Sequence, residues 1–435
     1  MIIKAKHYTS IIFLQALSAG LILLPTLSLY SQEEATENPS ENISIQQNTL
    51  DYDTAINRII SNSPKLKIAE LEIQAAAADV QQVSMYPNPY FSYELDNIGG
   101  SGDWNGADGS ESTYQIDQPI ELGGKRRLRR NLATYEYYAA VTEYDIIKTA
   151  LLNMATKTYI DLIEAQEYLR LANEKKDIAE KSLEITLEKL NSGKVSSIKK
   201  ARAEIALSKA ESELTHASMV FLGAKETLSN LWGCQTADFD FAVYPFYMTN
   251  SPASLCDYIE EIDQKPELVQ VYYESLAAKE NVHLQRSNGI PDVTLSVGYI
   301  TENNSRNQGF LLGVGLPLPV FDRNQGEIRR ARADASKAVY IYEDVRRALT
   351  AKLTLAHKKL AQSYQNSQRL NQEPLKLAQQ TCDLAQEGHQ DGKFEYLEVL
   401  EMHKELIEIK ENQIEILSEY HHKKADIDFL TSDFE

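Results

Sequence analysis

Apolar and polar residues alternate along four short segments of the chain, and this alternation predicts β-strands. The segments are residues 90–97, 113–122, 292–299 and 310–320. A period of two places every second side chain on one face of a sheet, so each strand has one apolar face. Each segment has roughly ten residues, and a tilted strand that crosses an outer membrane needs about 9–11. The length favours membrane strands, although the alternation alone also fits the half-buried sheet of a soluble domain.

Elsewhere apolar residues recur at steps of three and four, which predicts long amphipathic helices. The two longest helical stretches run over about 125–190 and about 326–388. About 65 residues at ~1.5 Å each give a helix of ~100 Å, which a globular domain rarely uses. Packing of these helices as coiled coils is predicted by leucines at the matching spacing: Leu162, Leu169, Leu183, Leu187 and Leu190.

The same order of elements occurs twice, at an offset of about 200 residues, which indicates duplication of a whole structural unit. Each unit has a helix, two strands around a polar loop, a very long helix and a returning helix. For example, "IDQPIELGGKRRLRRNLA" matches "GVGLPLPVFDRNQGEIRRARAD", and "LNSGKVSSIKKARAE" matches "HQDGKFEYLEVLE". We assign residues 49–231 to the first repeat, 263–430 to the second, and 232–262 to a segment that connects them.

The N-terminal residues 1–31 predict a secretory signal peptide. Two lysines precede the apolar run 11–24, and small residues follow, with a cleavage site after Ser31. The run is short for a membrane span, so an uncleaved anchor is the less favoured alternative. Residues 32–48 are polar and predict a disordered leader. No later segment approaches ~18 uninterrupted apolar residues, so we expect no transmembrane helix in the mature chain.

Charge argues against a nucleic-acid-binding protein. The 435 residues carry 44 Lys and Arg against 63 Asp and Glu, a net charge of −19, whereas nucleic-acid-binding domains are usually basic. One basic cluster after the second strand segment is a local exception: Lys125, Arg126, Arg127, Arg129 and Arg130. Cations at a helix start oppose the helix dipole and need partners. Phosphates of the membrane's inner leaflet and carboxylates of neighbouring helices are equally favoured partners.

Motifs for catalysis are absent from the sequence. We find no phosphate-binding glycine loop, no HExxH and no nucleophile elbow, so we expect neither an enzyme nor a cofactor. The three cysteines lack metal-site spacing, and a disulfide between Cys234 and Cys256 stays open at this point. His421 and His422 form the one histidine pair, and we expect a solvated helix end there rather than a metal site.

Four strands are too few to close a membrane barrel, since the smallest such barrels have about eight. An open sheet edge in lipid leaves backbone groups unpaired at several kcal/mol each. The chain must therefore combine its strands with those of other copies. Two copies would give eight strands and three would give twelve, and symmetry alone does not choose between them.

Three segments of the chain resemble the TolC-type outer-membrane efflux proteins, most of all the branch that serves heavy-metal resistance pumps. They are "PNPYFSYELDNIGGSG", "QPIELGGKRRLRR" and "PDVTLSVGY…GVGLPLPVFDRNQGEI". The resemblance covers about residues 50–430. It implies a mostly α-helical homotrimer, with a twelve-stranded barrel in the outer membrane of a diderm bacterium above a periplasmic α-helical barrel.

The same resemblance implies the function and the partners. The trimer would be a passive exit duct in a tripartite efflux system. An inner-membrane pump and a periplasmic adaptor would deliver the substrate, heavy-metal cations. A duct for drugs or for type I protein secretion is the alternative within the channel class. A periplasmic coiled coil without a pore is the alternative of another class, but it leaves the amphipathic strands unexplained.

Two sites follow from the resemblance. The helical turns at Gly193–Lys194 and Gly392–Lys393 would dock the adaptor, although they are also simply turns. Glu398 and Glu401 would form acidic rings at the periplasmic mouth, because three residues of spacing put them on one helix face. A solvated helix face is the alternative. The matching first-repeat segment carries two lysines that would pair with these glutamates and hold the mouth closed: Lys199 and Lys200.

Overall fold

The computed structural model describes residues 48–102, 109–303 and 306–431. The predicted signal peptide, residues 1–31, and nearly all of the predicted leader, residues 32–48, lie outside these ranges. Among the helices of the described ranges, none combines the length and the apolar character that a membrane crossing requires.

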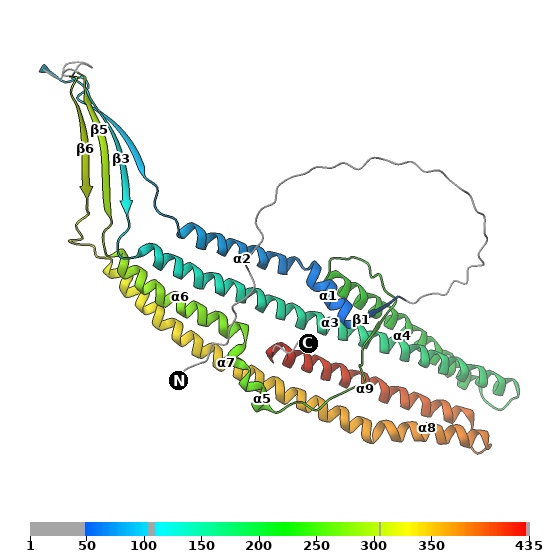
Figure 1. Ribbon diagram of the computed structural model, residues 1–435. Coiled ribbons are helices and arrows are strands. Elements are labelled where there is room, and N and C mark those ends of the chain that lie inside the picture. Colours follow the sequence, from blue (N-terminus) through cyan, green and yellow to red (C-terminus); the bar gives the residue numbers. More distant parts are fainter. Residues whose placement is uncertain (1–47, 103–108, 304–305, 432–435) are drawn as a thin grey trace, which may run out of the picture. The chain divides into compact units, whose positions relative to one another are not determined.

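The first repeat leads through a strand pair into two long antiparallel helices (Figure 1). The longer one, α3, is a single helix of 67 residues, which confirms the prediction of a very long helix. The elements are β1 (Thr49–Asp51), α1 (Tyr52–Asn62), α2 (Pro64–Val83), β2 (Tyr90–Asp96), β3 (Glu111–Ile120), α3 (Lys125–Asn191) and α4 (Ser197–Asn230).

The second repeat has the same order of elements, but its long helix is interrupted. The prediction of one helix over about 326–388 is wrong at Glu373, whose φ of −122° and ψ of −62° leave the helix. Pro374 follows, has no N–H to donate and disfavours a helical residue before it. The elements are α6 (Pro266–Asn288), β5 (Val293–Glu302), β6 (Gln308–Gly315), α7 (Gln325–Gln372), α8 (Pro374–Gln390) and α9 (Tyr396–Thr431).

The four long strands form one antiparallel sheet in the order β2-β3-β5-β6. The pairing register confirms one apolar face, because it aligns apolar residues across all four strands. One row is Phe91, Ile116, Val297 and Leu312. The next is Tyr93, Tyr114, Tyr299 and Phe310. Strand β6 ends at Gly315 rather than at 320, because Pro317 and Pro319 cannot donate to a ladder.

The connecting segment holds short elements that the sequence did not predict. They are β4 (Phe241–Val243), α5 (Leu255–Glu260) and the 3-10 helix η2 (Ile262–Gln264). Strand β4 pairs in parallel with β1, the first strand of the chain. The hydroxyl of Tyr159, in the middle of α3, lies 2.9 Å from the carbonyl oxygen of Leu50 and 2.8 Å from that of Val243. This small sheet therefore ties the start of the first repeat and the connecting segment to α3.

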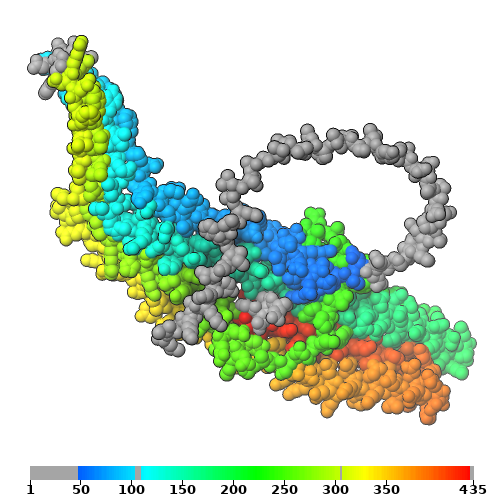
Figure 2. All heavy atoms as spheres, in the orientation of Figure 1, coloured from blue at the N-terminus to red at the C-terminus, as the bar shows by residue number. Residues whose placement is uncertain are grey.

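The main core lies where α3 meets α9 and the connecting segment. Helix α9 packs against both α3 and α8, and its red atoms run beside the orange atoms of α8 in Figure 2. Side chains from these elements that are almost fully buried include Tyr159, Leu162, Leu171, Phe246 and Leu417. A second cluster joins α6, α7 and α9, with Leu268, Leu353 and Ile427. Burial of such side chains stabilises the fold by about 1.5–3 kcal/mol each.

Candidate functional site

The turn between strand β3 and helix α3 depends on two glycines. Gly123 and Gly124 have φ of +71° and +74°, in the left-handed region that other residues rarely adopt. A Cβ at Gly123 would lie 2.6 Å from the hydroxyl of Ser287 and 2.9 Å from Ile290. The second repeat makes the equivalent turn with Asn324, which also has a positive φ of 61°.

Two cations of the basic cluster bind carboxylates of the same chain. The buried Lys125 lies 2.7 Å from Asp292, the residue just before β5. Arg129 makes a two-pronged bond with Glu121, the residue just after β3, at 2.5 and 2.9 Å. For Lys125 and Arg129 the partners are therefore carboxylates of the protein and not lipid phosphates. These carboxylates lie next to the strands, whereas the prediction placed them on neighbouring helices. Burial raises the pKa of Asp292, but the bonds from Lys125 and the backbone outweigh it and lower that pKa.

The other three cations of the cluster have different surroundings. The guanidinium of Arg126 stacks on the ring of Tyr86, with Cζ 3.8 Å from the ring centroid. Arg127 and Arg130 are exposed, and no carboxylate of the described ranges forms an ion pair with either one. The five cations therefore do not act as one patch, because three of them are already engaged within the chain.

Both helical turns at the far end of the long helices close with the same hydrogen bonds. In the first repeat the N–H of Gly193 donates to the carbonyl of Leu190, and that of Lys194 to Lys189. In the second repeat Gly392 donates to His389 and Lys393 to Gly388. This is the Schellman arrangement, which needs a left-handed residue at the position of each glycine. The two glycines have φ of +71° and +73° and nothing within 4 Å of a Cβ.

The proposed mouth residues lie close to these turns. Glu398 and Glu401 are exposed in the first two turns of α9, while Val399 and Leu400 between them are buried. Among the residues that the structure describes, neither lysine forms an ion pair with either of these glutamates, and Lys200 lies 3.3 Å from Glu204 instead. The two turns are instead joined by a pair that the sequence analysis missed. Its residues are Lys189 and Glu395, 2.8 Å apart, and the lysine lowers the pKa of that glutamate.

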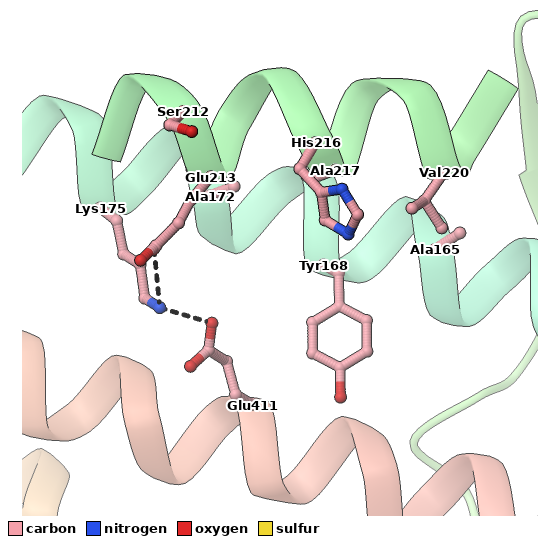
Figure 3. Close-up of a pocket in the computed structure, with 10 residues that line it drawn as sticks. All are labelled: Ala165, Tyr168, Ala172, Lys175, Ser212, Glu213, His216, Ala217, Val220 and Glu411. Carbon is pink, nitrogen blue, oxygen red and sulfur yellow. Dashed lines mark hydrogen bonds and ion pairs between the residues drawn. The ribbon is translucent and has the colours of Figure 1, made fainter. Parts of the chain in front are cut away.

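A cavity of about 460 Å³ lies among α3, α4 and α9 (Figure 3). The ammonium of Lys175 on α3 lies 2.7 Å from Glu411 of α9 and 3.3 Å from Glu213 of α4. Burial lowers the pKa of Lys175, but the two carboxylates outweigh it and raise that pKa. Burial also raises the pKa of Tyr168, which lines the cavity, to about 12. One lysine thus links three helices of the wall.

The histidine pair is not a solvated helix end, so that prediction is wrong. His421 is only 4% exposed, stacks on Phe246 and donates from Nε2 to the carbonyl of that residue at 2.7 Å. Burial lowers the pKa of His421 to about 4. His422 lies 2.9 Å from Asp161. The residues that the structure describes contain no group of three His, Cys, Asp or Glu that could hold a metal. Cys234 and Cys256 are exposed and unpaired.

Comparison with known proteins connects this geometry to a family. Residues 55–234 and 259–431 match the family model described as "Outer membrane efflux protein". The cobalt-zinc-cadmium resistance protein CzcC of Cupriavidus metallidurans is 27% identical over 87% of this chain and 89% of its own length. The channel CmeC of Campylobacter jejuni has a TM-score of 0.70 at 15% identity, covering 87% of this chain and 85% of its own. A structure of CusC has a TM-score of 0.67 at 18% identity, covering 92% and 98%.

Proposed function

Because the chain belongs to the outer membrane efflux protein family, we propose that three copies of it form a passive exit duct for heavy-metal cations. As a member of this family it is a non-enzymatic efflux channel of the outer membrane, with a large helical portion in the periplasm. In the proposal, a periplasmic adaptor docks at the Gly193 and Gly392 turns and connects the trimer to an inner-membrane pump. Glu398 and Glu401 then line the periplasmic mouth.

The open sheet carries the trimer proposal. Strands β2 and β6 each have a neighbour on one side only within the described chain. The apolar face reaches the edge strand β6 with Phe310 and Leu312 still 88% and 81% exposed. Closure requires strands from other copies, because an open edge in lipid costs several kcal/mol per unpaired group. The interior of a barrel of about eight strands is filled by its own side chains, whereas a barrel of twelve strands, from three copies, leaves room for a duct.

The mass of the purified protein in detergent tests this assembly. We expect light scattering with a correction for detergent to give three chains per particle, and planar bilayers to show a pore current. A stable monodisperse monomer with full β content would contradict the trimer. Two chains per particle would support a closed eight-stranded barrel without a duct.

The substrate proposal draws on the relatives. CzcC is named as a cobalt-zinc-cadmium resistance protein, and it aligns with most of this chain. We expect a strain that lacks the protein to lose tolerance to cobalt, zinc and cadmium, with tolerance restored by the gene on a plasmid. Unchanged metal tolerance together with lost tolerance to drugs or lost protein secretion would instead support the alternative duct.

A further inference from the structure

An open cavity of about 460 Å³ lies where the sheet meets the helices, between the start of α3 and the end of α6. Exposed basic side chains from both helices line it: Arg127 from α3, and His283 and Arg286 from α6. Apolar side chains lie beside them, namely Leu128 and the 43% exposed Ile290. The cavity thus combines cationic groups with an apolar wall.

The cations in this cavity are not neutralised by pairs. Within the described ranges neither Arg127 nor Arg286 forms an ion pair. Glu280 is the one carboxylate among the lining residues, and its Oε1 accepts a hydrogen bond from Asn131 at 2.9 Å. Counting the histidine as neutral, two arginines and one glutamate leave a net charge of +1. One phosphodiester group carries the opposite charge.

Arg127 points away from the polar face of the sheet. Lys125 and Arg129 bond to Asp292 and Glu121, which continue the alternation of the polar face beyond the strand ends. Arg127 lies two residues from each of these cations, about 200° around the helix. Its side chain is therefore on the side of the apolar face, which meets lipid in a membrane barrel.

The cavity also lies away from the contacts between copies. Helices α3 and α6 join the two central strands, β3 and β5, whereas the open edges are β2 and β6. Neighbouring copies add their strands at those edges, so they do not cover the centre of the sheet. Helix α3 starts at Lys125, only a few residues after β3 ends at Ile120. The cavity is therefore at the level where the strands leave the lipid.

We infer that Arg127, Arg286 and His283 form a binding site for the headgroup phosphate of a glycerophospholipid of the inner leaflet. Guanidinium groups bind phosphate through paired, charge-assisted hydrogen bonds, and basic hollows at membrane boundaries bind lipid headgroups. Ile290 and Leu128 contact the glycerol and the first acyl carbons. The bound lipid fixes the depth of the barrel in the membrane. This inference rests on the proposed barrel, but not on the exported substrate.

The test compares two double variants of the full-length protein in detergent. Arg127→Gln with Arg286→Gln removes both cavity arginines. Arg130→Gln with Arg329→Gln removes two exposed charges from the starts of α3 and α7, outside the cavity. Dioleoylphosphatidylglycerol is titrated and bound lipid is counted by native mass spectrometry. We expect about one retained lipid per chain in the parent and the control, and affinity lower by about tenfold or more in the cavity variant.

Several results would overturn the inference. Equal lipid retention in the cavity variant and the parent would do so, as would equal loss in both double variants. Displacement of the lipid by equimolar inorganic phosphate would show a site for free phosphate instead. If the cavity variant does not assemble, Arg286→Gln alone is compared with Arg329→Gln alone under the same criteria. Particle mass and pore current of the parent are recorded in the same samples, so a failure of the proposed channel is seen separately.

Discussion

The two repeats close their far turns in the same way but build their long helices differently. Both turns use a left-handed glycine and the same two backbone hydrogen bonds. Helix α3 runs without a break for 67 residues, whereas α7 ends at Gln372 and α8 begins at Pro374. Lys175 and Pro374 each lie 18 positions before the glycine of their own turn. At this position the first repeat has Lys175, whose ion pairs connect α3 to α4 and α9. The second repeat has the interruption between α7 and α8.

This difference shows which features the duplication has kept. The turns are alike because a tight reversal between two helices has few solutions, and the left-handed glycine is one of them. The helix wall is less constrained, because coiled-coil packing tolerates a break if the neighbours supply contacts. We therefore expect substitutions at the two turns to have the same effect in both repeats. Substitutions where the strands meet the helices, or in the long packed helices, should have different effects in the two repeats.

The largest effect is expected at the turns. Gly193→Val or Gly392→Val places a β-branched residue at a positive φ, which costs about 1–2 kcal/mol locally and distorts the turn. The distortion leaves the distant strands unchanged, so trimers should persist while efflux is abolished, measured as metal tolerance of a complemented strain. Asparagine tolerates this conformation, so Gly193→Asn serves as the control. Unchanged tolerance in both valine variants would count against adaptor docking at the turns.

The ion pairs where the strands meet the long helices should contribute very differently to stability in the two repeats. Lys125→Met leaves Asp292 without its buried partner and should lower the free energy of unfolding by about 2–3 kcal/mol. In the second repeat Arg330 is 74% exposed and its two carboxylates are 3.9 Å away, so Arg330→Met should cost less than about 0.5 kcal/mol. Thermal unfolding followed by circular dichroism measures both. Equal shifts in the two variants would show that the junctions are equivalent.

The returning helices α4 and α9 should differ in their response to pH. The pKa of buried His421 is about 4, against an ordinary value of about 6.5. As the pH falls, the unfolded chain takes up this proton first, so stability present at neutral pH is lost between about 6.5 and 4. The expected loss is about 3 kcal/mol, measured by thermal unfolding across this range. His421→Gln should remove this component, and His216→Gln, on an exposed residue of α4, should retain it.

The sequence predicted the strands, their apolar face, the long helices and the repeat, because each depends on a regular local pattern. It did not predict the pairing of β1 with β4, since three-residue strands carry no period. His421 was placed in solvent because nothing near it in the chain reveals Phe246, which is 175 positions away. The partner of Lys125 was missed for the same reason, because Asp292 is far from it in the sequence. Glu121, the partner of Arg129, lies only eight positions before it, so this ion pair could have been predicted from the sequence.

A smaller effect is expected in the helix wall. Lys175→Met keeps the length of the side chain but removes the link between α3, α4 and α9. Two carboxylates then lose a partly buried partner, and we expect a loss of about 1–2 kcal/mol in thermal unfolding. Lys176→Met is the matched control, because the one ion pair of Lys176 within the described ranges is with Glu180, one turn along the same helix. A loss no greater than that of the control would mean that the link contributes nothing to the wall.

The smallest effect concerns the charge of the proposed mouth, where the repeats differ in sign. Glu398→Gln with Glu401→Gln should lower the cation-to-anion permeability ratio about two- to threefold in planar bilayers, because rings of carboxylates concentrate cations. Block by divalent and trivalent cations should weaken as well. The control, Glu211→Gln with Glu226→Gln, removes the same charge from exposed positions on α4.

The lysines of the first repeat give the opposite test. Lys199→Gln with Lys200→Gln removes positive charge at the matching turn and should raise cation selectivity, if both sets of residues face the same opening. In the described chain Lys200 pairs with Glu204, so the proposed pairing with Glu398 or Glu401 is tested as a contact between copies. A pairing of that kind would make the two double variants non-additive when combined. Selectivity and block that match the parent in all variants would place the acidic ring elsewhere on the channel.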